Sequence, residues 1–257
     1  MGIGYILGCL LSVFLWRLDR QVVAAKINEA IFSKIKNKLL IQVIYAVLVI
    51  LICYIFSFIK VRELNNLITA FIIIDISNTE RKNLGKRERV HFYDSISTIS
   101  RSMICGFIAP LFYIIIGGNV LGVGYAIIYN IACCNEGFYL FRYLCNMLNI
   151  IPSFLGDIIL YPIYAYRNKS IKVDFKGDFL KNLFIRPLLN VDIFAAFLES
   201  VNFYYYFENS NTSFIKSYGQ YNNKIDEVSI KDYLSIAYGV CLLIFICFFI
   251  IITKSSI

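Results

Sequence analysis

Two long stretches without a charged side chain constrain this chain more than any other feature of its sequence. The segments Leu39–Ile59 and Tyr233–Thr253 are almost wholly apolar, and lysine or arginine residues flank each of them. A helix needs about 20 apolar residues to cross the hydrocarbon core of a bilayer, and both segments reach that length. The sequence therefore predicts an integral membrane protein.

The composition supports this interpretation and excludes several classes of protein. Hydrophobic residues make up 59% of the 257 residues and charged residues only 16%, so a soluble domain could not cover its own surface. The net charge of +8 comes from lysines and arginines beside apolar runs, which is typical of membrane proteins and not of nucleic-acid binders. The single histidine, His91, and the absence of a C-x-x-C pair among the cysteines predict no metal site.

Three further apolar segments carry weaker signals. Met1–Trp16 is short for a span, but it lacks the basic start of a signal peptide, so we expect an uncleaved first membrane helix. Met103–Cys134 is interrupted by Gly117-Gly118-Asn119, which predicts a hairpin that enters the membrane and returns. Leu144–Tyr166 contains Asp157, which at membrane depth must be paired or face a polar cavity.

The orientation of the helices depends on one ambiguous segment. The basic segment 17–38 is expected in the cytoplasm, and the segment 81–101 is equally basic. Both can lie on that side only if Leu64–Ile76 crosses the membrane, or if Met1–Trp16 and Leu39–Ile59 do not both cross singly. The sequence leaves open whether Leu64–Ile76 is a span or an interfacial or re-entrant helix.

The predicted fold is an all-α, polytopic integral membrane protein with roughly five to seven membrane-embedded helices. We expect a single membrane domain over residues 1–257, with polar loops at about 77–102 and 167–232 that face the cytoplasm. An aromatic cluster at Phe203–Phe207 is expected at the membrane interface. The expected location is the cell membrane, multi-pass, of the bacterial inner-membrane type.

A basic cluster is a candidate for ligand binding. Residues 81–91 read RKNLGKRERVH, and the cationic side chains among them can hold a phosphate through charge-assisted hydrogen bonds. The same composition is typical of an ordinary cytoplasmic loop of a membrane protein. Both interpretations stay open from the residues alone.

The run GFIAPLFYIIIGG, from Gly106 to Gly118 and followed by Tyr125, resembles the central signature of the CobD/CbiB family of cobalamin biosynthesis. Weaker similarities occur at Ile151-Pro152 with Leu155, at Tyr206-Phe207, and at Ser229 with Asp232. The resemblance is clearest over residues 81–257.

This resemblance implies an adenosylcobinamide-phosphate synthase, which joins adenosylcobyric acid to an aminopropanol phosphate by ATP-dependent amide formation. The implied partners are the lipid bilayer and a corrinoid substrate, and nucleic acid is not among them. ATP and Mg²⁺ are implied only if that activity is retained. No catalytic residue is identified, and the substrate-binding residues that the resemblance and the basic cluster indicate are Arg81, Lys86, Arg87, Arg89, Gly106, Pro110, Gly117, Gly118 and Tyr125.

The departures from the family fall on its polar groups. Where the family has Glu-Ser-Val-Ala-Glu-Asn-Thr-Val-Asp, this chain has STISRSMIC at residues 97–105. Ser97 and Arg101 replace glutamates, and Cys105 replaces an aspartate, which removes a hard oxygen ligand of the kind that Mg²⁺ prefers. Two hypotheses follow: a divergent synthase, and a catalytically inactive membrane paralogue with a partner or sensory role, like the AmpE-like proteins.

Overall fold

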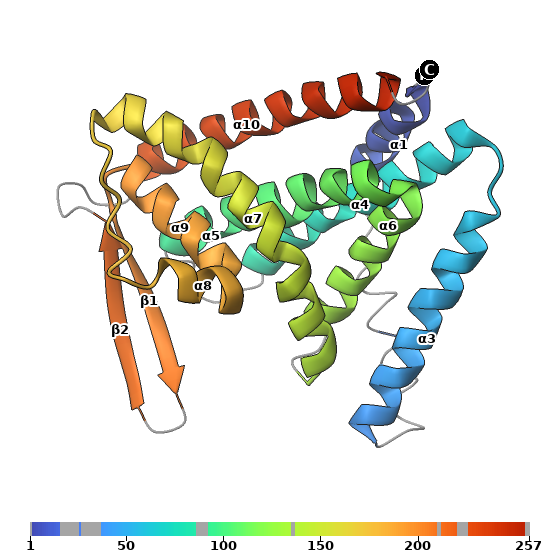
Figure 1. Cartoon of the computed structure of the whole chain (residues 1–257), viewed down its shortest axis with the longest axis horizontal. Helices are drawn as coiled ribbons and strands as arrows, with labels where there is room; N and C mark the ends of the chain where they lie inside the picture. Colours follow the sequence, from blue (N-terminus) through green and yellow to red (C-terminus); the bar gives the residue numbers. More distant parts are fainter. Residues whose placement is uncertain are drawn as a thin grey trace. The chain divides into compact units, whose positions relative to one another are not determined.

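The computed structural model describes residues 2–15, 26, 37–85, 92–134, 137–209, 212–219 and 226–254 (Figure 1). Its helices in chain order are α1 (Ile3–Phe14), α3 (Lys38–Ser57), α4 (Arg62–Gly85), α5 (Phe92–Met103), α6 (Ala109–Cys134), α7 (Tyr139–Asn168), α8 (Phe179–Ile185), α9 (Pro187–Leu198) and α10 (Glu227–Lys254), with a π-helical turn at Ile104–Ile108 between α5 and α6. The all-α fold class is confirmed. An antiparallel hairpin of β1 (Asn202–Asn209) and β2 (Thr212–Gly219), which the sequence did not predict, is added to it.

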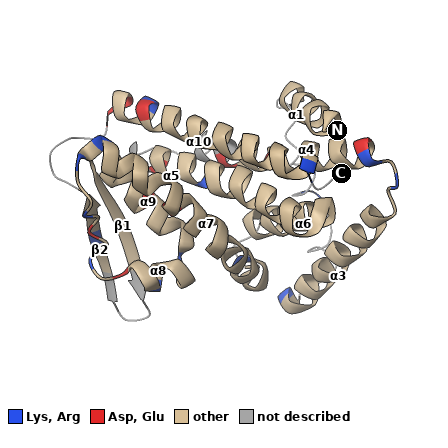
Figure 2. Ribbon diagram, turned by 45° about the horizontal axis from the view of Figure 1, so that its top comes forward, with Lys and Arg blue, Asp and Glu red and all other residues tan. Residues whose placement is uncertain are grey.

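Within the described residues, four helical stretches are long and apolar enough to cross a membrane. They are α3, the stretch Asp94–Cys134 that includes α6, and the helices α7 and α10. Figure 2 shows that α3 carries no charged residue between its ends. With the shorter apolar helices α1 and α9, this set agrees roughly with the predicted number of membrane-embedded helices.

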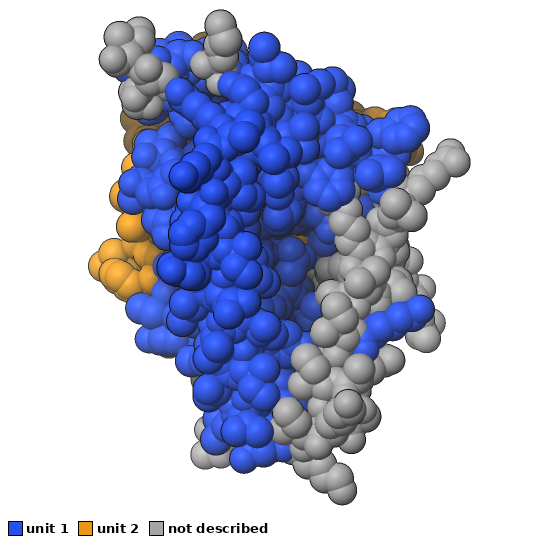
Figure 3. Space-filling view, turned by 90° about the vertical axis from the view of Figure 1, so that its right-hand side faces the viewer, with its two compact units in different colours: residues 1–79, 105–148, 245–257 blue, residues 80–104, 149–244 orange. Residues whose placement is uncertain are grey.

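The chain folds into two compact units, which Figure 3 distinguishes by colour. Unit 1 comprises residues 1–79, 105–148 and 245–257, and unit 2 comprises residues 80–104 and 149–244. The helices α4, α7 and α10 each contribute residues to both units. The single domain over residues 1–257 stays a prediction.

In unit 1, α1 packs closely against α4 through small residues. A Cβ atom added at Gly4 would lie 2.2 Å from the backbone oxygen of Glu63, and one added at Gly8 would lie 2.3 Å from the backbone oxygen of Leu67. Glycines spaced four residues apart let two helix backbones approach each other in this way. Both contacts therefore require glycine.

The helices α1 and α4 also run in the same direction. One turn beyond Gly8, the Ser12 hydroxyl donates a hydrogen bond to the backbone oxygen of Phe71 at 3.2 Å, which is one turn beyond Leu67. The segment Leu64–Ile76 is thus part of a longer helix parallel to the first one. Whether this helix crosses a membrane, and on which side the two basic segments lie, stays a prediction.

The helix α6 consists of two limbs that fold back on each other. Gly117 and Gly118 leave helical backbone angles, and the φ of 72° at Gly118 lies in the left-handed region that favours glycine. The rings of Tyr113 and Tyr125 stack with their centroids 5.3 Å apart, whereas a straight helix would separate these residues by about 18 Å. The predicted reversal within Met103–Cys134 is confirmed.

In unit 2, α9 forms the core. Every residue from Leu189 to Leu198 is buried, and α9 contacts α5, α8 and both strands. Along β1, Phe203 and Phe207 are buried while Tyr204 and Tyr206 are exposed, which is the alternation expected of a strand with one face on the core. The aromatic cluster thus belongs to a strand with one face packed in the core.

Three predicted segments differ from the structure. The described residues within about 77–102 are helical rather than a loop, and 167–232 contains α8, α9 and the hairpin. The polar composition of α5 concealed an amphipathic helix, since Ile96, Ser100 and Met103 recur at helical spacing and are buried. The first apolar segment forms a helix of only 12 residues, α1, which is shorter than a span.

Replacing Gly8 by valine is expected to destabilise unit 1, because a side chain there meets the Leu67 backbone oxygen and the Ala70 Cβ atom. Overpacking of this kind costs about 1–3 kcal/mol, so thermal unfolding in detergent should occur at a lower temperature. Gly239→Val is the matched control, since nothing lies within 4 Å of a Cβ atom at Gly239. Equal shifts in both variants would contradict the close packing of α1 on α4.

Candidate functional site

Polar side chains from four helices of unit 2 meet at α9. Ser97 and Ser100 come from α5, Asp157 from α7, Asp192 from α9 and Tyr233 from α10. The Ser97 hydroxyl donates a hydrogen bond to Asp192 Oδ2 at 3.0 Å, and the Ser100 and Tyr233 hydroxyls share a hydrogen bond of 2.9 Å. We call these five residues the acidic core.

Ring contacts fix how α7 and α9 place Asp157. Tyr161 on α7 contacts Phe194 on α9 with ring centroids 6.3 Å apart, and Tyr164 contacts Phe197 at 6.2 Å. Because both pairs advance by the same number of residues, the two helices run in the same direction at this contact. Asp157 lies one turn before Tyr161 on α7, and Asn190 lies one turn before Phe194 on α9. Asp157 and Asn190 are therefore level with each other.

Several buried oxygen atoms in this region have no hydrogen-bond partner. They are both carboxylate oxygens of Asp157, Oδ1 of Asp192, Oδ1 of Asn190, and Oγ of Ser153, which lies one turn before Asp157. None of these four side chains is more than 4% exposed. Burial of unpaired acceptors is unfavourable, and an unpaired acid at membrane depth is characteristic of a functional site. The acidic core can therefore accept a cation or a ligand group that donates protons.

Charged side chains from two other helices act on Asp192. The Arg101 guanidinium on α5 attracts its carboxylate, and Glu80 on α4 repels it. A carboxylate that is held by one hydroxyl and leaves its other oxygen without a partner is placed to act as a general base.

A charged network ties the ends of three helices together beside this core. Arg167, at the end of α7, donates hydrogen bonds to both carboxylate oxygens of Glu199 at 3.1 and 3.3 Å, and a further one to Asp232 on α10. Burial raises the pKa of Glu199 to about 7, although Arg167 acts in the opposite direction. The network fixes Glu199, the residue after α9, against α7 and α10.

Five of the nine residues predicted for substrate binding belong to unit 1, whereas the acidic core belongs to unit 2. Gly106 is buried in the π-helical turn, where a Cβ atom would lie 2.2 Å from the Ser77 hydroxyl, and Pro110 is buried at the start of α6. Tyr125 is buried between two other tyrosine rings. Gly117 and Gly118 form the reversal of α6. These residues shape the packing of α6, and their proposed role in substrate binding stays a prediction.

The basic cluster falls largely outside the described residues. Arg81 lies in α4, but its side chain is not described, and Lys86, Arg87 and Arg89 lie outside the described residues altogether. Sequence reasoning singled out Asp157 and missed Asp192. A signal for Asp192 does exist, since it is the sole charged residue in the apolar run LLNVDIFAAFL at residues 188–198.

The stretches that carry the weaker family similarities belong to unit 2. Ile151-Pro152 lies on α7, the Tyr206-Phe207 pair lies on β1, and Ser229 with Asp232 lies at the start of α10. All but the last residue of the stretch 97–105 also lies in this unit. Segments that are far apart in the sequence thus contribute to the helices and strands around α9.

The oxygen ligands of the acidic core suit a hard ion such as the Mg²⁺ that the resemblance implies. Asp157 and Asp192 supply the unpartnered carboxylate oxygens, and Mg²⁺ is usually held by one or two carboxylates together with water and substrate phosphates. Among the described residues, no group of three His, Cys, Asp or Glu side chains is arranged to hold a metal ion. An ion here would therefore depend on neutral oxygens and on the substrate as well.

Comparisons of the chain with known protein families, with curated proteins and with solved structures found no match. The function must therefore be argued from the chemistry of the site, because a fold by itself does not establish an activity.

The protein is expected to lose stability as the pH rises through about 7. In the folded protein the pKa of Glu199 is about 7, against an ordinary value of 4.5, so folding retains a proton that the unfolded chain has released. The resulting stabilisation is complete below the ordinary pKa of 4.5 and is lost as the pH rises past the folded-state pKa of about 7. Thermal unfolding temperatures measured in detergent from about pH 5 to about pH 8 should fall.

The variant Glu199→Gln should flatten that fall, because a glutamine side chain has no proton to retain on folding. Glu227→Gln is a matched control because its carboxylate is largely exposed in an ion pair with Lys231. An unchanged pH profile in Glu199→Gln would show that Glu199 does not retain a proton on folding.

Proposed function

We propose that this chain is a divergent membrane protein of the CobD/CbiB type, which joins an aminopropanol phosphate to adenosylcobyric acid by ATP-dependent amide formation. The acidic core supports the proposal most strongly, because buried carboxylates with unpartnered oxygens lie on α7 and α9. The stretches with the weaker similarities to the family lie in the same unit, whereas the run Gly106–Gly118 lies in unit 1. The proposed location is the cell membrane, of the bacterial inner-membrane type.

The placement of Asp192 addresses the main departure from the family. The family has glutamates where this chain has Ser97 and Arg101 on α5. The Ser97 hydroxyl donates a hydrogen bond to Asp192, and Arg101 acts electrostatically on the same carboxylate. Asp192 thus offers a carboxylate beside the positions on α5 where the family carries its acids, which supports retained acid–base chemistry with a changed donor.

Amide formation requires the amine nitrogen to lose a proton as it bonds to the activated carbonyl carbon, while the activating group leaves with the carboxylate oxygen. Asp192 can accept that proton, since its Oδ1 atom has no hydrogen-bond partner. The unpartnered oxygens of Asp157 can hold the ammonium group of the substrate before the reaction. Mg²⁺ held at these oxygens would supply neutralisation of phosphate charge.

The second candidate is a catalytically inactive paralogue with a partner or sensory role. Cys105 favours it, because this residue stands where the family has an aspartate and is only 1% exposed in the π-helical turn. A buried thiol serves packing well and is a poor ligand for a hard ion. Under this hypothesis the helices keep the family's packing without its reaction.

The purified protein should form the amide from adenosylcobyric acid, ATP and the aminopropanol phosphate. Asp192→Asn removes the proposed general base and should lower the rate by about 10²–10⁴-fold, while the exposed-site variant Glu227→Gln should retain it. Product is measured by chromatography against a no-protein sample and an active family member. No product above the no-protein sample would exclude the synthase and favour the inactive paralogue.

The variant Asp157→Asn separates a functional role of this acid from a structural one. It removes a buried carboxylate that has no hydrogen-bond partner, so the unfolding temperature should stay the same or rise while amide formation is lost. Asp178→Asn provides the contrast, since Asp178 pairs with Lys216 and its loss should not raise stability. A marked loss of stability in Asp157→Asn would mean that the acid supports the fold.

A further inference from the structure

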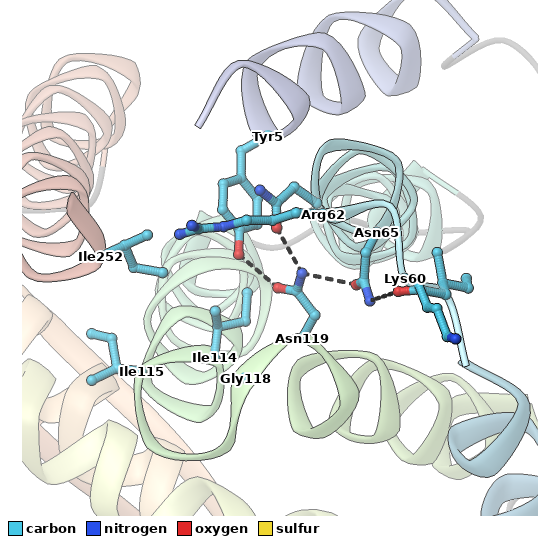
Figure 4. Close-up of a pocket in the computed structure, with 11 residues that line it drawn as sticks. Tyr5, Lys60, Arg62, Asn65, Ile114, Ile115, Gly118, Asn119 and Ile252 are labelled. Carbon is cyan, nitrogen blue, oxygen red and sulfur yellow. Dashed lines mark hydrogen bonds between the residues drawn. The ribbon is translucent and has the colours of Figure 1, made fainter. Parts of the chain in front are cut away.

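A pocket of about 450 Å³ lies at one end of unit 1. It is bordered by the start of α1, the turn from α3 into α4, the reversal of α6 and the end of α10, as Figure 4 shows. Of the residues that the sequence predicted for substrate binding, Gly118 lines this pocket. Its volume falls within the range of small-molecule sites, and none of the residues of the acidic core takes part in it.

The polar floor of the pocket is held in a fixed arrangement. Asn119 Nδ2 donates hydrogen bonds to Oδ1 of Asn65 and Oδ1 of Asn66, each at 2.8 Å. The Tyr5 hydroxyl donates one to Asn119 Oδ1 at 2.6 Å. Figure 4 shows these side chains converging on Asn119 from α1 and α4. A preorganised set of amides and a phenol favours a polar ligand group, since no rearrangement is needed on binding.

The rim of the pocket is positively charged. Lys60 and Arg62 both line it and are exposed, and Figure 4 shows Arg62 extending across Tyr5 while Lys60 lies on the other side of Asn119. Glu63 follows Arg62 in the sequence and precedes the asparagines of the pocket floor. Its carboxylate accepts a hydrogen bond from the Gly4 backbone nitrogen at 2.7 Å. Two cations beside fixed hydrogen-bonding groups are typical of a phosphate site.

One wall of the pocket is apolar and belongs to the membrane-spanning part of the unit. Figure 4 groups Ile114, Ile115 and Ile252 on one side of Asn119, and Ile115 is 42% exposed. Lys60 and Arg62 directly follow the end of α3, which is the place where cationic side chains meet lipid headgroups. A ligand here can place an anionic group on the rim and an apolar part along the isoleucines.

The helices α1 and α4 both start at the pocket and run away from it in parallel. The sequence predicts that the basic segments that follow these helices are cytoplasmic. On that prediction we expect the pocket at the opposite leaflet, and a component of that leaflet is a more suitable ligand than a cytoplasmic nucleotide or corrinoid.

We infer that this pocket binds the phosphate headgroup of an anionic phospholipid, with Lys60 and Arg62 on the phosphate and the asparagine floor on the polar part of the headgroup. The site is separate from the acidic core and does not depend on the proposed synthase activity. Free phosphate and the aminopropanol phosphate share the same anionic group, so the test must separate these sources.

The test measures thermal unfolding of the full chain in detergent with added dioctanoyl phosphatidylglycerol, dioctanoyl phosphatidylcholine, inorganic phosphate or aminopropanol phosphate. Phosphatidylglycerol should raise the unfolding temperature of the unmodified protein most. In the double variant Lys60→Gln/Arg62→Gln, the concentration of phosphatidylglycerol needed for half of the rise should increase about tenfold or more, because two charge-assisted contacts are lost. Lys38→Gln, at the other end of α3, is the matched control.

Each alternative result has a definite meaning. An equal rise with phosphatidylcholine, or an unchanged response of the double variant, would overturn anionic recognition by Lys60 and Arg62. A full rise with inorganic phosphate or with aminopropanol phosphate alone would overturn the assignment to a lipid. A double variant that no longer folds is recognised by its circular dichroism, and the single variant Arg62→Gln then provides the same comparison.

Discussion

Polar groups within the helices of this protein must bind one another, because the surrounding hydrocarbon offers them no hydrogen-bond partner. This constraint explains how the charged and amide side chains are distributed. Asn119 is held by Tyr5 and two asparagines of α4, and Arg167 is held by Glu199 and Asp232 at the end of α7. Where such pairing is complete, the polar group stabilises the arrangement of the helices.

The acidic core departs from this rule. Asp157 and Asp192 are buried together with Asn190, yet several of their oxygen atoms have no partner. Most of the unpartnered buried atoms among the described residues belong to this group of side chains, and the others are Ser153 Oγ, Asn182 Nδ2 and Asn202 Oδ1. Buried acids without partners are a source of instability that a bound cation or substrate can relieve. This contrast within one chain, more than the resemblance to a family, is the reason to place function in unit 2.

The sequence predicted much of the fold because its strongest signals are local. The apolar lengths of α3 and α10 follow from bilayer thickness, and the reversal of α6 follows from Gly117 and Gly118. The close contact of α1 with α4 could not be predicted from the sequence, because it depends on Gly4 and Gly8 packing against a helix about 60 positions away. The hairpin was missed because its aromatic residues were interpreted as interfacial rather than as an alternating strand.

The candidate site was predicted only in part, for a physical reason. Asp157 stands out as an acid inside an apolar segment, whereas Asp192 falls in a region whose average composition is polar although α9 itself is buried. Averages over long segments conceal one short buried helix. The glycine signature at Gly106 to Gly118 lies in unit 1 and shapes the packing of α6, and its proposed role in substrate binding stays a prediction.

The central claim is that the acidic core of unit 2 binds the ammonium group of the amine substrate. Binding of the aminopropanol phosphate tests it most directly and can be measured by titration calorimetry of the protein in detergent. The account predicts that the unmodified protein binds this compound and that a folded Asp157→Asn, Asp192→Asn double variant does not. No binding to the unmodified protein, or equal binding to both proteins, would contradict it.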